Sequence, residues 1–246
     1  MNSRGQARAP AATSAGSEGL LVRWLGGVPY GEALALQERT VRARRRGEIG
    51  DQLLLLEHPA VITLGSGAHE ENVRISPAEL AVRGIETFRV RRGGDVTFHA
   101  PGQLVGYLVA DLSEGRAPDV HHFLREIEGA LIEVLAAFGL LGRRIPGWTG
   151  VFMDREPGSD GPLERKIASI GVGLRGWVSY HGFALNVDLD LAGFETIVPC
   201  GLEGVEMTSL EREFREFASV PGSSPDAAHV RAQVSEAFCR RFGRCE

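Results

Sequence analysis

Strand-like apolar segments follow one another along this chain instead of alternating one by one with helices. The strand patterns cover residues 52–57, 60–64, 86–91, 103–112, 149–153, 166–174 and 177–187. The helical patterns cover residues 30–46, 119–138 and 227–242. Because a parallel α/β sheet needs a crossover helix after nearly every strand, this order predicts an α+β fold. We expect a mixed, largely antiparallel sheet flanked by helices.

The overall composition excludes several classes of protein. The chain of 246 residues contains no apolar run of transmembrane length, and its net charge of -5 is not that of a nucleic-acid binder.

Residues 1–18 are small and polar and are expected to form a disordered tail, with one folded domain over 19–246. Three cysteines are too few, and odd in number, for a disulfide scaffold, so a reducing, cytoplasmic location is expected.

Lysine is almost absent from the chain. Of the 27 Lys and Arg residues, one is Lys, at Lys166, and the other 26 are Arg. Codon bias accounts for most of this imbalance, yet a single retained amine can also reflect a chemical need. A lysine can give up its proton in a suitable setting, whereas an arginine in effect cannot. The count alone leaves both explanations of Lys166 open.

A glycine-rich segment, RRGGDVTFHAPGQ, occupies residues 91–103. Its paired glycines let backbone N–H groups approach a ligand closely, with Arg92 and His99 as polar anchors. Thr97 and His99 alternate on a short strand that ends at a Pro-Gly turn. A hairpin with a surface histidine would have the same composition, so a ligand loop and a plain turn both remain open.

Two further segments are strands that can border a site. In RKIASIG, residues 165–171, strand alternation places Lys166 on one face and Ser169 on the other. In SYHGFALNV, residues 179–187, a glycine indicates that another group approaches closely. His181 is then either a ligand contact or a hydrogen-bonded structural residue.

A sharp turn, IVPCGL, contains the most distinctive cysteine of the chain. Pro199 fixes the entry to the turn and Gly201 frees the exit, so Cys200 is a candidate nucleophile, although free cysteines are more often small buried hydrophobic residues. Cys239 and Cys245 lack such a setting and are expected to be inert. A thiolate attacks better than a thiol, and a nearby ammonium favours the thiolate. Cys200 and Lys166 together could therefore perform a two-step acyl transfer without ATP or metal.

The four segments in this order resemble the lipoyl(octanoyl) transferases of the biotin and lipoate protein ligase superfamily. The resemblance spans about residues 50–210 and rests on RGGDVTFHAPGQ, KIASIG, HGFALNVDLD and VPCGLEGVEMTSL. It implies the catalytic-domain fold of the biotin and lipoate protein ligases, and a single catalytic domain over 19–246. The implied activity moves an octanoyl group from octanoyl-acyl carrier protein, through a thioester, to a lysine, as the first step of endogenous protein lipoylation.

The resemblance also implies roles for individual residues. Cys200 would carry the acyl group and Lys166 would activate it. The substrate-contacting segments of the family correspond to Arg92, Gly93, Gly94, Asp95, Val96, Thr97, Phe98, His99, Ser169, Ile170, Gly171, Gly182, Phe183 and Ala184. No cofactor and no metal are implied.

The implied partners are octanoyl-acyl carrier protein as donor and lipoyl domains as acceptors, without nucleic acid or membrane. The acceptors would be the lipoyl domains of 2-oxoacid dehydrogenase complexes and the glycine cleavage H protein. Acyl carrier proteins are acidic, so a basic face should dock them. The densest basic run is Arg42, Arg44, Arg45 and Arg46, followed by Arg91, Arg92, Arg143 and Arg144. A solvated helix end with favourable dipole placement is an equal explanation of the first run.

The sequence departs from the family pattern at three places. Ala100 stands where the family usually has Gly, and Phe98 where Tyr or Trp is common. Either change could narrow the acyl tunnel. The stretch 154–164 is longer than usual and polar, and we expect it to be a surface loop.

Two other functions remain open at this stage. An ATP-dependent lipoate or biotin ligase would use the same fold and a lysine, but would need no cysteine. A non-catalytic module that binds a lipoyl domain or an acyl carrier would need neither Lys166 nor Cys200.

Overall fold

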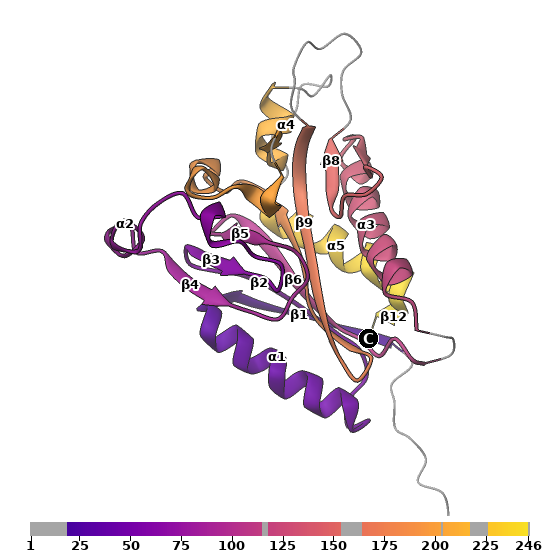
Figure 1. The fold of residues 1–246 in the computed structure, drawn as a ribbon. Coiled ribbons are helices and arrows are strands. Elements are labelled where there is room, and N and C mark those ends of the chain that lie inside the picture. The colour runs from indigo at the N-terminus through magenta and orange to yellow at the C-terminus, as the bar shows by residue number, and fades with distance from the viewer. Residues whose placement is uncertain (1–18, 115–117, 154–163, 203, 217–225, 246) are drawn as a thin grey trace, which may run out of the picture.

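The computed structural model describes residues 19–114, 118–153, 164–202, 204–216 and 226–245. Twelve strands in these ranges form one large and one small sheet, with helices on both faces of the large sheet (Figure 1). The large sheet runs in the order β12 (Arg244–Cys245), β1 (Gly19–Gly27), β2 (Gln52–Glu57), β6 (Gln103–Val109), β10 (Val178–Asn186), β9 (Glu164–Arg175), β8 (Val151–Met153) and β7 (Gly142–Arg143), and β11 (Val205–Met207) pairs with β9 off this path.

Most pairs of neighbouring strands in the large sheet are antiparallel, among them β2 with β6, β6 with β10, and β10 with β9. Parallel pairs join β1 to β2, β1 to β12 and β11 to β9. The small sheet has the order β4 (Glu86–Arg89), β3 (Val61–Leu64) and β5 (Val96–His99), with one parallel and one antiparallel pair. The predicted mixed, largely antiparallel α+β fold is therefore confirmed.

Three long helices cover the two faces of the large sheet. Helices α3 (Val120–Ala137) and α5 (Ala227–Phe242) pack against each other on one face, and α1 (Tyr30–Arg45) packs on the other against β6 and β10 (Figure 1). Short helices α2 (Pro77–Val82) and α4 (Leu210–Glu216) and the 3-10 turns η1 (Glu70–Asn72), η2 (Leu191–Thr196) and η3 (Pro199–Gly201) complete the chain. None of the helices in the described ranges is long and apolar enough to cross a membrane.

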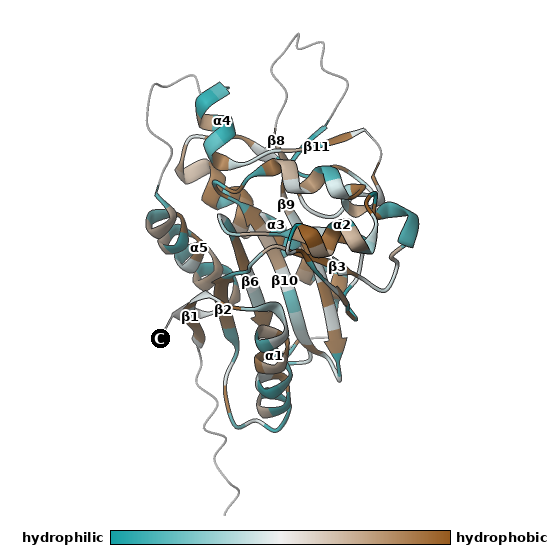
Figure 2. Ribbon diagram, turned by 90° about the vertical axis from the view of Figure 1, so that its left-hand side faces the viewer, coloured by the Kyte–Doolittle hydropathy of each residue, from teal (hydrophilic) through white to brown (hydrophobic). Residues whose placement is uncertain are grey.

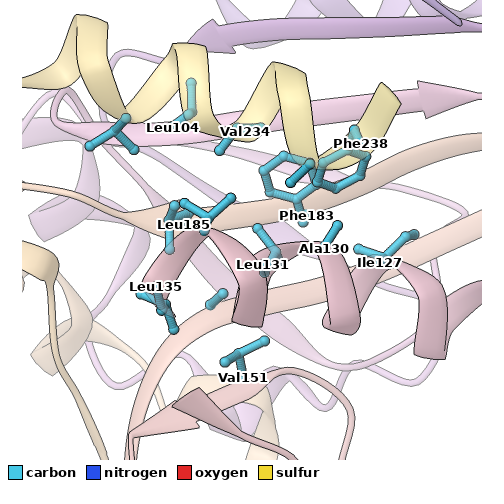
Figure 3. Packing of buried hydrophobic residues seen from close by; sticks show 14 of the residues in the cluster. Leu104, Ile127, Ala130, Leu131, Leu135, Val151, Phe183, Leu185, Val234 and Phe238 are labelled. Atoms are coloured by element: carbon cyan, nitrogen blue, oxygen red, sulfur yellow. The ribbon is translucent and has the colours of Figure 1, made fainter. Parts of the chain in front are cut away.

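The strand alternation of the central strands separates two apolar layers. On β10, Phe183 and Leu185 face α3 and α5, whereas Ala184 between them faces α1. The layer under α3 and α5 is the main core, in which Phe183 and Phe238 stack with ring centroids 4.8 Å apart (Figure 3). Hydrophobic colour accordingly runs along the central strands, whereas α1 is largely hydrophilic (Figure 2).

Helix α1 is polar even on its buried face. Its buried residues recur at helical spacing and are Tyr30, Ala33, Gln37, Thr40, Val41 and Arg44. Gln37 is 1% exposed and Arg44 is 7% exposed, so both side chains need polar partners inside the protein. One of these partners lies on β10 and bears on the functional site.

A β-bulge interrupts β9 beside β8. Val151 pairs with Ala168, and the next residue of β8, Phe152, pairs with Lys166, so Ile167 is an extra residue on β9. Both Ile167 and Ala168 belong to the main core. Lys166 and Ser169 both reach Cys200 Sγ, so the expectation that these two side chains lie on opposite faces is wrong, because simple alternation does not continue across a bulge.

Most predicted elements occur within a few residues of their expected bounds, and the differences have local causes. The pattern missed β1, α2 and α4, and also β7, β11 and β12, which are two or three residues long. Helix α2 has a capping box of Ser76 and Glu79, a local signal that sequence inspection could have found. The tail 1–18 and nearly all of the expected loop 154–164 lie outside the described residues.

Cys239 is disulfide-bonded, and Cys200 is a free cysteine. This disulfide was not predicted from the sequence, but a disulfide-bonded Cys239 offers no free thiol as a nucleophile. An odd number of cysteines allows one pair as long as a third cysteine stays free.

The main core depends on α3, which generates a first prediction. Leu131 is fully buried beneath the sheet, so Leu131→Ala should lower the free energy of unfolding by about 2–5 kcal/mol through lost transfer energy and a residual cavity. Denaturant unfolding followed by circular dichroism measures this. Val82→Ala, at an 89% exposed site, should change it by less than about 0.5 kcal/mol. Equal effects of the two substitutions would contradict the packing described here.

Candidate active site

Cys200 and Lys166 lie in direct contact, as the sequence predicts for an acyl-transfer pair. Lys166 Nζ donates a hydrogen bond to Cys200 Sγ at 3.2 Å, and Ser169 Oγ lies 3.9 Å from the same sulfur. Lys166 is 1% exposed, whereas Cys200 is partly accessible. The site therefore joins a buried ammonium to a cysteine that is itself only partly exposed.

The cavity for the lysine side chain depends on Gly150. A Cβ at Gly150 would lie 2.7 Å from Lys166 Cε and 2.6 Å from the Ala168 carbonyl oxygen, so no larger residue fits. Lys166 Nζ also donates to the Thr149 carbonyl at 3.0 Å and lies 5.3 Å from the centroid of the Phe152 ring. These contacts replace the water that an exposed ammonium would bind.

A fully buried carboxylate on α3 holds the backbone that receives Lys166. Glu128 accepts a hydrogen bond from the Gly150 N–H at 3.1 Å and from Arg125 and Arg144. The peptide between Thr149 and Gly150 thus carries the Lys166 interaction on one side and the Glu128 interaction on the other. Sequence inspection missed this link because Glu128 resembles any polar position of an amphipathic helix.

Cys200 sits on a strained turn that the neighbouring loop holds in place. Its φ is +57°, a left-handed conformation that non-glycine residues rarely adopt. The Val198 N–H donates to the Asn72 carbonyl at 2.7 Å, and Asn72 donates its side-chain N–H to Asp95. A Cβ at Gly201 would lie 2.6 Å from Asp95 Oδ2, so the glycine lets the turn rest on Asp95.

Several charges act on the Cys200 thiol. Burial raises the pKa of Cys200, but Lys166, by its charge and its hydrogen bond, the charge of Arg92 and the Ser169 hydroxyl outweigh burial. The net effect lowers the pKa of Cys200 below that of an ordinary thiol. The site therefore favours the thiolate, which is the nucleophilic form.

The glycine-rich loop runs directly across β9. The Gly93 N–H donates to the Val172 carbonyl at 2.8 Å, and a Cβ at Gly171 would lie 2.8 Å from the Gly93 carbonyl oxygen. Arg92 is 8% exposed and donates to the Thr63 carbonyl, the Thr63 hydroxyl and the Gly93 carbonyl. Glycines on both sides of the crossing thus let loop and strand touch through their backbones.

A pocket opens beside Cys200, and most of the predicted contact residues line it. The lining residues named from the sequence are Arg92, Gly94, Asp95, Thr97, His99, Ser169, Ile170, Gly171, Gly182, Phe183 and Ala184. Gly93 forms the loop crossing instead. Val96 and Phe98 lie in the core of the small sheet, where Phe98 packs against Phe194, so these two alternate positions of β5 face away from the pocket.

Asp95 holds the loops of the site together. Its Oδ1 accepts from the backbone N–H groups of His69 and Val96, and its Oδ2 accepts from Asn72. The carboxylate lines the pocket, but its oxygens are already engaged by the protein. Its placement supports the turn of Cys200 directly.

Sequence inspection missed the polar floor of the pocket. Tyr30, Val105 and Tyr107 also line the pocket, as does His181, and His58 hydrogen-bonds to the Tyr107 hydroxyl at 2.6 Å. Burial lowers the pKa of His58 to about 4 and those of His99 and His181 to about 3. The floor is therefore polar but uncharged near neutral pH. Tyr107 gave no signal because it lies in an apolar strand pattern, and Tyr30 because it is a single aromatic residue at the start of a predicted helix.

The arginines of the basic run are largely engaged within the protein. Arg44 is buried and forms ion pairs with Asp51 and Glu114. Arg42 and Arg46 pair with Glu38 and Glu48. The run therefore offers less free positive charge than its sequence indicates.

No group of three or more His, Cys, Asp or Glu side chains in the described ranges could hold a metal ion. The chemistry available here comes from a thiolate, an ammonium and a narrow pocket. These groups suit acyl transfer through a covalent thioester.

Comparisons with known proteins agree on the family. The model of the lipoyl protein ligase A/B catalytic domain matches residues 29–239. The octanoyltransferase of Chloroflexus aurantiacus is 44% identical over 220 residues, which cover 89% of this chain and 94% of that protein. That of Rubrobacter xylanophilus is 49% identical over 222 residues, covering 82% and 95%. That of Myxococcus xanthus is 44% identical, and the chain spans 58% of its length.

Two solved structures show the same fold at low sequence identity. A bipartite lipoate protein ligase from Thermoplasma acidophilum aligns with a TM-score of 0.64 and 19% identity, covering 93% of this chain and 86% of that one. Lipoate-protein ligase A, solved with ATP, aligns with a TM-score of 0.66 and 18% identity, covering 93% and 88%. The expected ligase-like catalytic fold is confirmed.

The contact between Lys166 and Cys200 predicts a measurable reactivity. Lys166→Met keeps the side-chain length and removes the ammonium that lowers the pKa of Cys200, so that pKa should rise. Alkylation of Cys200 by iodoacetamide at pH 7 should become at least about tenfold slower, and its pH midpoint should move upward. Mass spectrometry of the Cys200 peptide against time measures both.

Arg39→Gln, on the exposed face of α1, is the matched control because it removes an equal charge elsewhere. It should leave the alkylation profile of Cys200 unchanged. An unaltered profile for Lys166→Met would show that the ammonium does not control the thiol.

The three buried histidines predict a pH dependence of stability. Each has a pKa of about 3 to 4 when folded, against about 6.5 when unfolded. The contribution of these neutral histidines to the free energy of unfolding is fully present above pH 6.5. It is lost as the pH falls, because the unfolded chain then binds protons that the folded protein does not bind. Between pH 6.5 and 5 the free energy of unfolding should fall, approaching about 1.4 kcal/mol per pH unit for each histidine. Urea unfolding across this range measures the slope, and a flat profile would contradict the buried, neutral state.

Proposed function

The chain belongs to the lipoyl protein ligase A/B catalytic-domain family, and on this premise we propose that it is an octanoyltransferase with a covalent mechanism. In the proposed reaction, octanoyl-acyl carrier protein is the donor and a lysine of a lipoyl domain is the acceptor. The observation that carries the proposal is the 3.2 Å contact between Lys166 Nζ and Cys200 Sγ. An ATP-dependent ligase would not need this thiol.

In the first half-reaction, the Cys200 thiolate attacks the carbonyl carbon of the octanoyl thioester. The bond from that carbon to the sulfur of the carrier breaks, and the bond to Cys200 Sγ forms. Lys166 Nζ, as an ammonium, gives its proton to the departing thiolate, which leaves as a thiol. The octanoyl group is then held on Cys200, and Lys166 is a neutral amine.

In the second half-reaction, the acceptor lysine attacks the thioester on Cys200. Lys166 takes the proton that the attacking amine must lose, and Cys200 leaves as a thiolate. The product is an amide, and the pair of ammonium and thiolate is restored. One lysine thus acts as acid in the first step and as base in the second.

The pocket next to Cys200 supports an acyl substrate. Ile170, Phe183 and Ala184 provide apolar surface, and the buried histidines of the floor carry no charge near neutral pH. Burying the methylene groups of an octanoyl chain at about 0.8 kcal/mol each contributes roughly 5 kcal/mol to binding. Such a pocket favours a medium chain over a much shorter one.

The proposed partners follow from the reaction. The donor is acidic and the acceptors are the lipoyl domains of 2-oxoacid dehydrogenase complexes and the glycine cleavage H protein. The mechanism needs a free thiol at Cys200, which a reducing compartment such as the cytoplasm preserves, and Cys200 is free although Cys239 is disulfide-bonded.

The proposal predicts a covalent intermediate that forms without ATP. The protein mixed with octanoyl-acyl carrier protein should gain one octanoyl group on Cys200, which intact and peptide mass spectrometry detects. Hydroxylamine should release this group, and added lipoyl domain should remove it while becoming octanoylated itself. Octanoylation of the lipoyl domain only from free octanoate and ATP would indicate a ligase, and no modification under either condition would leave a binding module.

Cys200→Ser and Lys166→Met should each reduce transfer at least about a thousandfold while the fold persists. Circular dichroism checks the fold of both variants. Arg175→Gln is the matched control because it lies on the same strand as Lys166, at the opposite end, and should transfer at the normal rate. Substantial transfer by either site variant would exclude the proposed pair.

A further inference from the structure

Two cavities meet at His181. One is the pocket beside Cys200, and the other lies between α1 and the strands β4 and β10. His181 lines both, and the second cavity has a volume of about 350 Å³ with Leu34, Gln37 and Val41 on its α1 side. The imidazole of His181 therefore stands between the catalytic pocket and an adjoining space.

The distance from Cys200 to His181 can be derived from the strand register. Ser169, whose hydroxyl lies 3.9 Å from Cys200 Sγ, is three residues from Val172 on β9, and Val172 is directly opposite His181. Three residues of extended strand span roughly 10 Å. An octanoyl chain has seven carbon–carbon bonds and extends roughly 8 Å, at the reach per bond of an extended chain. Because Gly93 covers β9 at Gly171 and Val172, the chain must run over the neighbouring strand β10, where Ala184 lies opposite Ser169 and Gly182 lines the pocket. The same three-residue span along β10 ends at His181.

Gln37 fixes the position of His181. Gln37 Oε1 accepts a hydrogen bond from the His181 N–H at 2.8 Å, across the contact between α1 and β10. His181 has a φ of +59°, a conformation that costs energy for a residue with a Cβ. The buried Gln37 amide helps to hold this conformation and, with it, the imidazole.

The far side of His181 is unfavourable for an alkyl chain. Gln37 Nε2 and His181 Nε2 are both buried and have no hydrogen-bond partner among the residues that the structure describes. The rim of the second cavity also includes Glu38, Arg91 and Arg175. A longer chain would have to displace the ring and then cover polar atoms that it cannot satisfy.

We propose that His181, held by Gln37, is the end wall of the acyl pocket and limits the chain to about eight carbons. This inference rests on the proposed acyl transfer to Cys200. It assigns the selectivity for acyl chain length to one side chain, His181, which separates the two cavities. Removal of that partition should convert the pocket into a longer channel.

The test compares loading of Cys200 from octanoyl and dodecanoyl acyl carrier protein, followed by mass spectrometry of the thioester. A dodecanoyl chain extends roughly 13 Å and does not fit in front of the wall. The unaltered protein should load octanoyl at least about a hundredfold faster than dodecanoyl. In His181→Gly the ratio should fall at least about tenfold, and glycine adopts the positive φ without strain.

Leu34→Ala is the matched control because it enlarges the second cavity and leaves the wall in place. It should keep the original ratio. Gln37→Ala, which frees the His181 backbone, should shift the ratio in the same direction as His181→Gly.

The outcomes separate this inference from the proposed function. If the unaltered protein forms no thioester with either donor, the acyl-transfer mechanism itself fails. If it loads octanoyl but His181→Gly and Gln37→Ala gain no dodecanoyl loading, whether or not they still load octanoyl, His181 is not the wall. Equal gains from Leu34→Ala would place the limit in the volume of the second cavity instead.

Discussion

The buried ammonium of Lys166 is the constraint on which the rest of the site depends. A charged group that is 1% exposed is stable in a fold only where close polar or anionic partners replace water. The described contacts that do this are the Thr149 carbonyl, the Phe152 ring and Cys200 Sγ. Because Cys200 is the only one of these that can become an anion, the thiolate and the buried lysine stabilise each other. The contact with the thiolate offsets the cost of burying the Lys166 ammonium, and the same contact makes the Cys200 thiol reactive.

Three backbone features bring these groups together, and each departs from regular structure. The bulge at Ile167 interrupts the alternation between Lys166 and Ser169, the glycine at 150 makes space for the lysine stem, and the positive φ of Cys200 points its sulfur inward. None of these stabilises the fold by itself. The interactions that hold them lie elsewhere, in Glu128 under Gly150 and in Asp95 under the cysteine turn. Rigid packing of α3 against the sheet thus supports the geometry of the reacting atoms.

The sequence predicted the fold class and the contact between Lys166 and Cys200, but not the details of the site. Strands and long helices were predictable because apolar residues recur at the periods of two and 3.6 residues that burial on one face requires. Alternation failed at β9, because a bulge adds one residue without a local composition signal. The pocket floor was missed for a different reason. Tyr107 lies in an apolar run and Tyr30 begins a predicted helix, and only the tertiary structure shows that both line a cavity and that the Tyr107 hydroxyl contacts His58.

The arrangement along β9 and β10 places the reacting groups at one end of the pocket and the surface that would bind the acyl tail at the other. Positive charge is concentrated at one end of the pocket, where Lys166 and Arg92 lower the pKa of the Cys200 thiol. At the other end, burial first and then the charge of nearby groups such as Arg92 lower the pKa of His99 and of His181, so both rings are neutral. An acyl chain needs this order, since its thioester carbonyl gains negative charge during reaction and its tail never does. A charged floor would attract water and weaken binding of the tail, whereas neutral rings can close the pocket without bringing charge to it, and the His99 ring still hydrogen-bonds to Gln103.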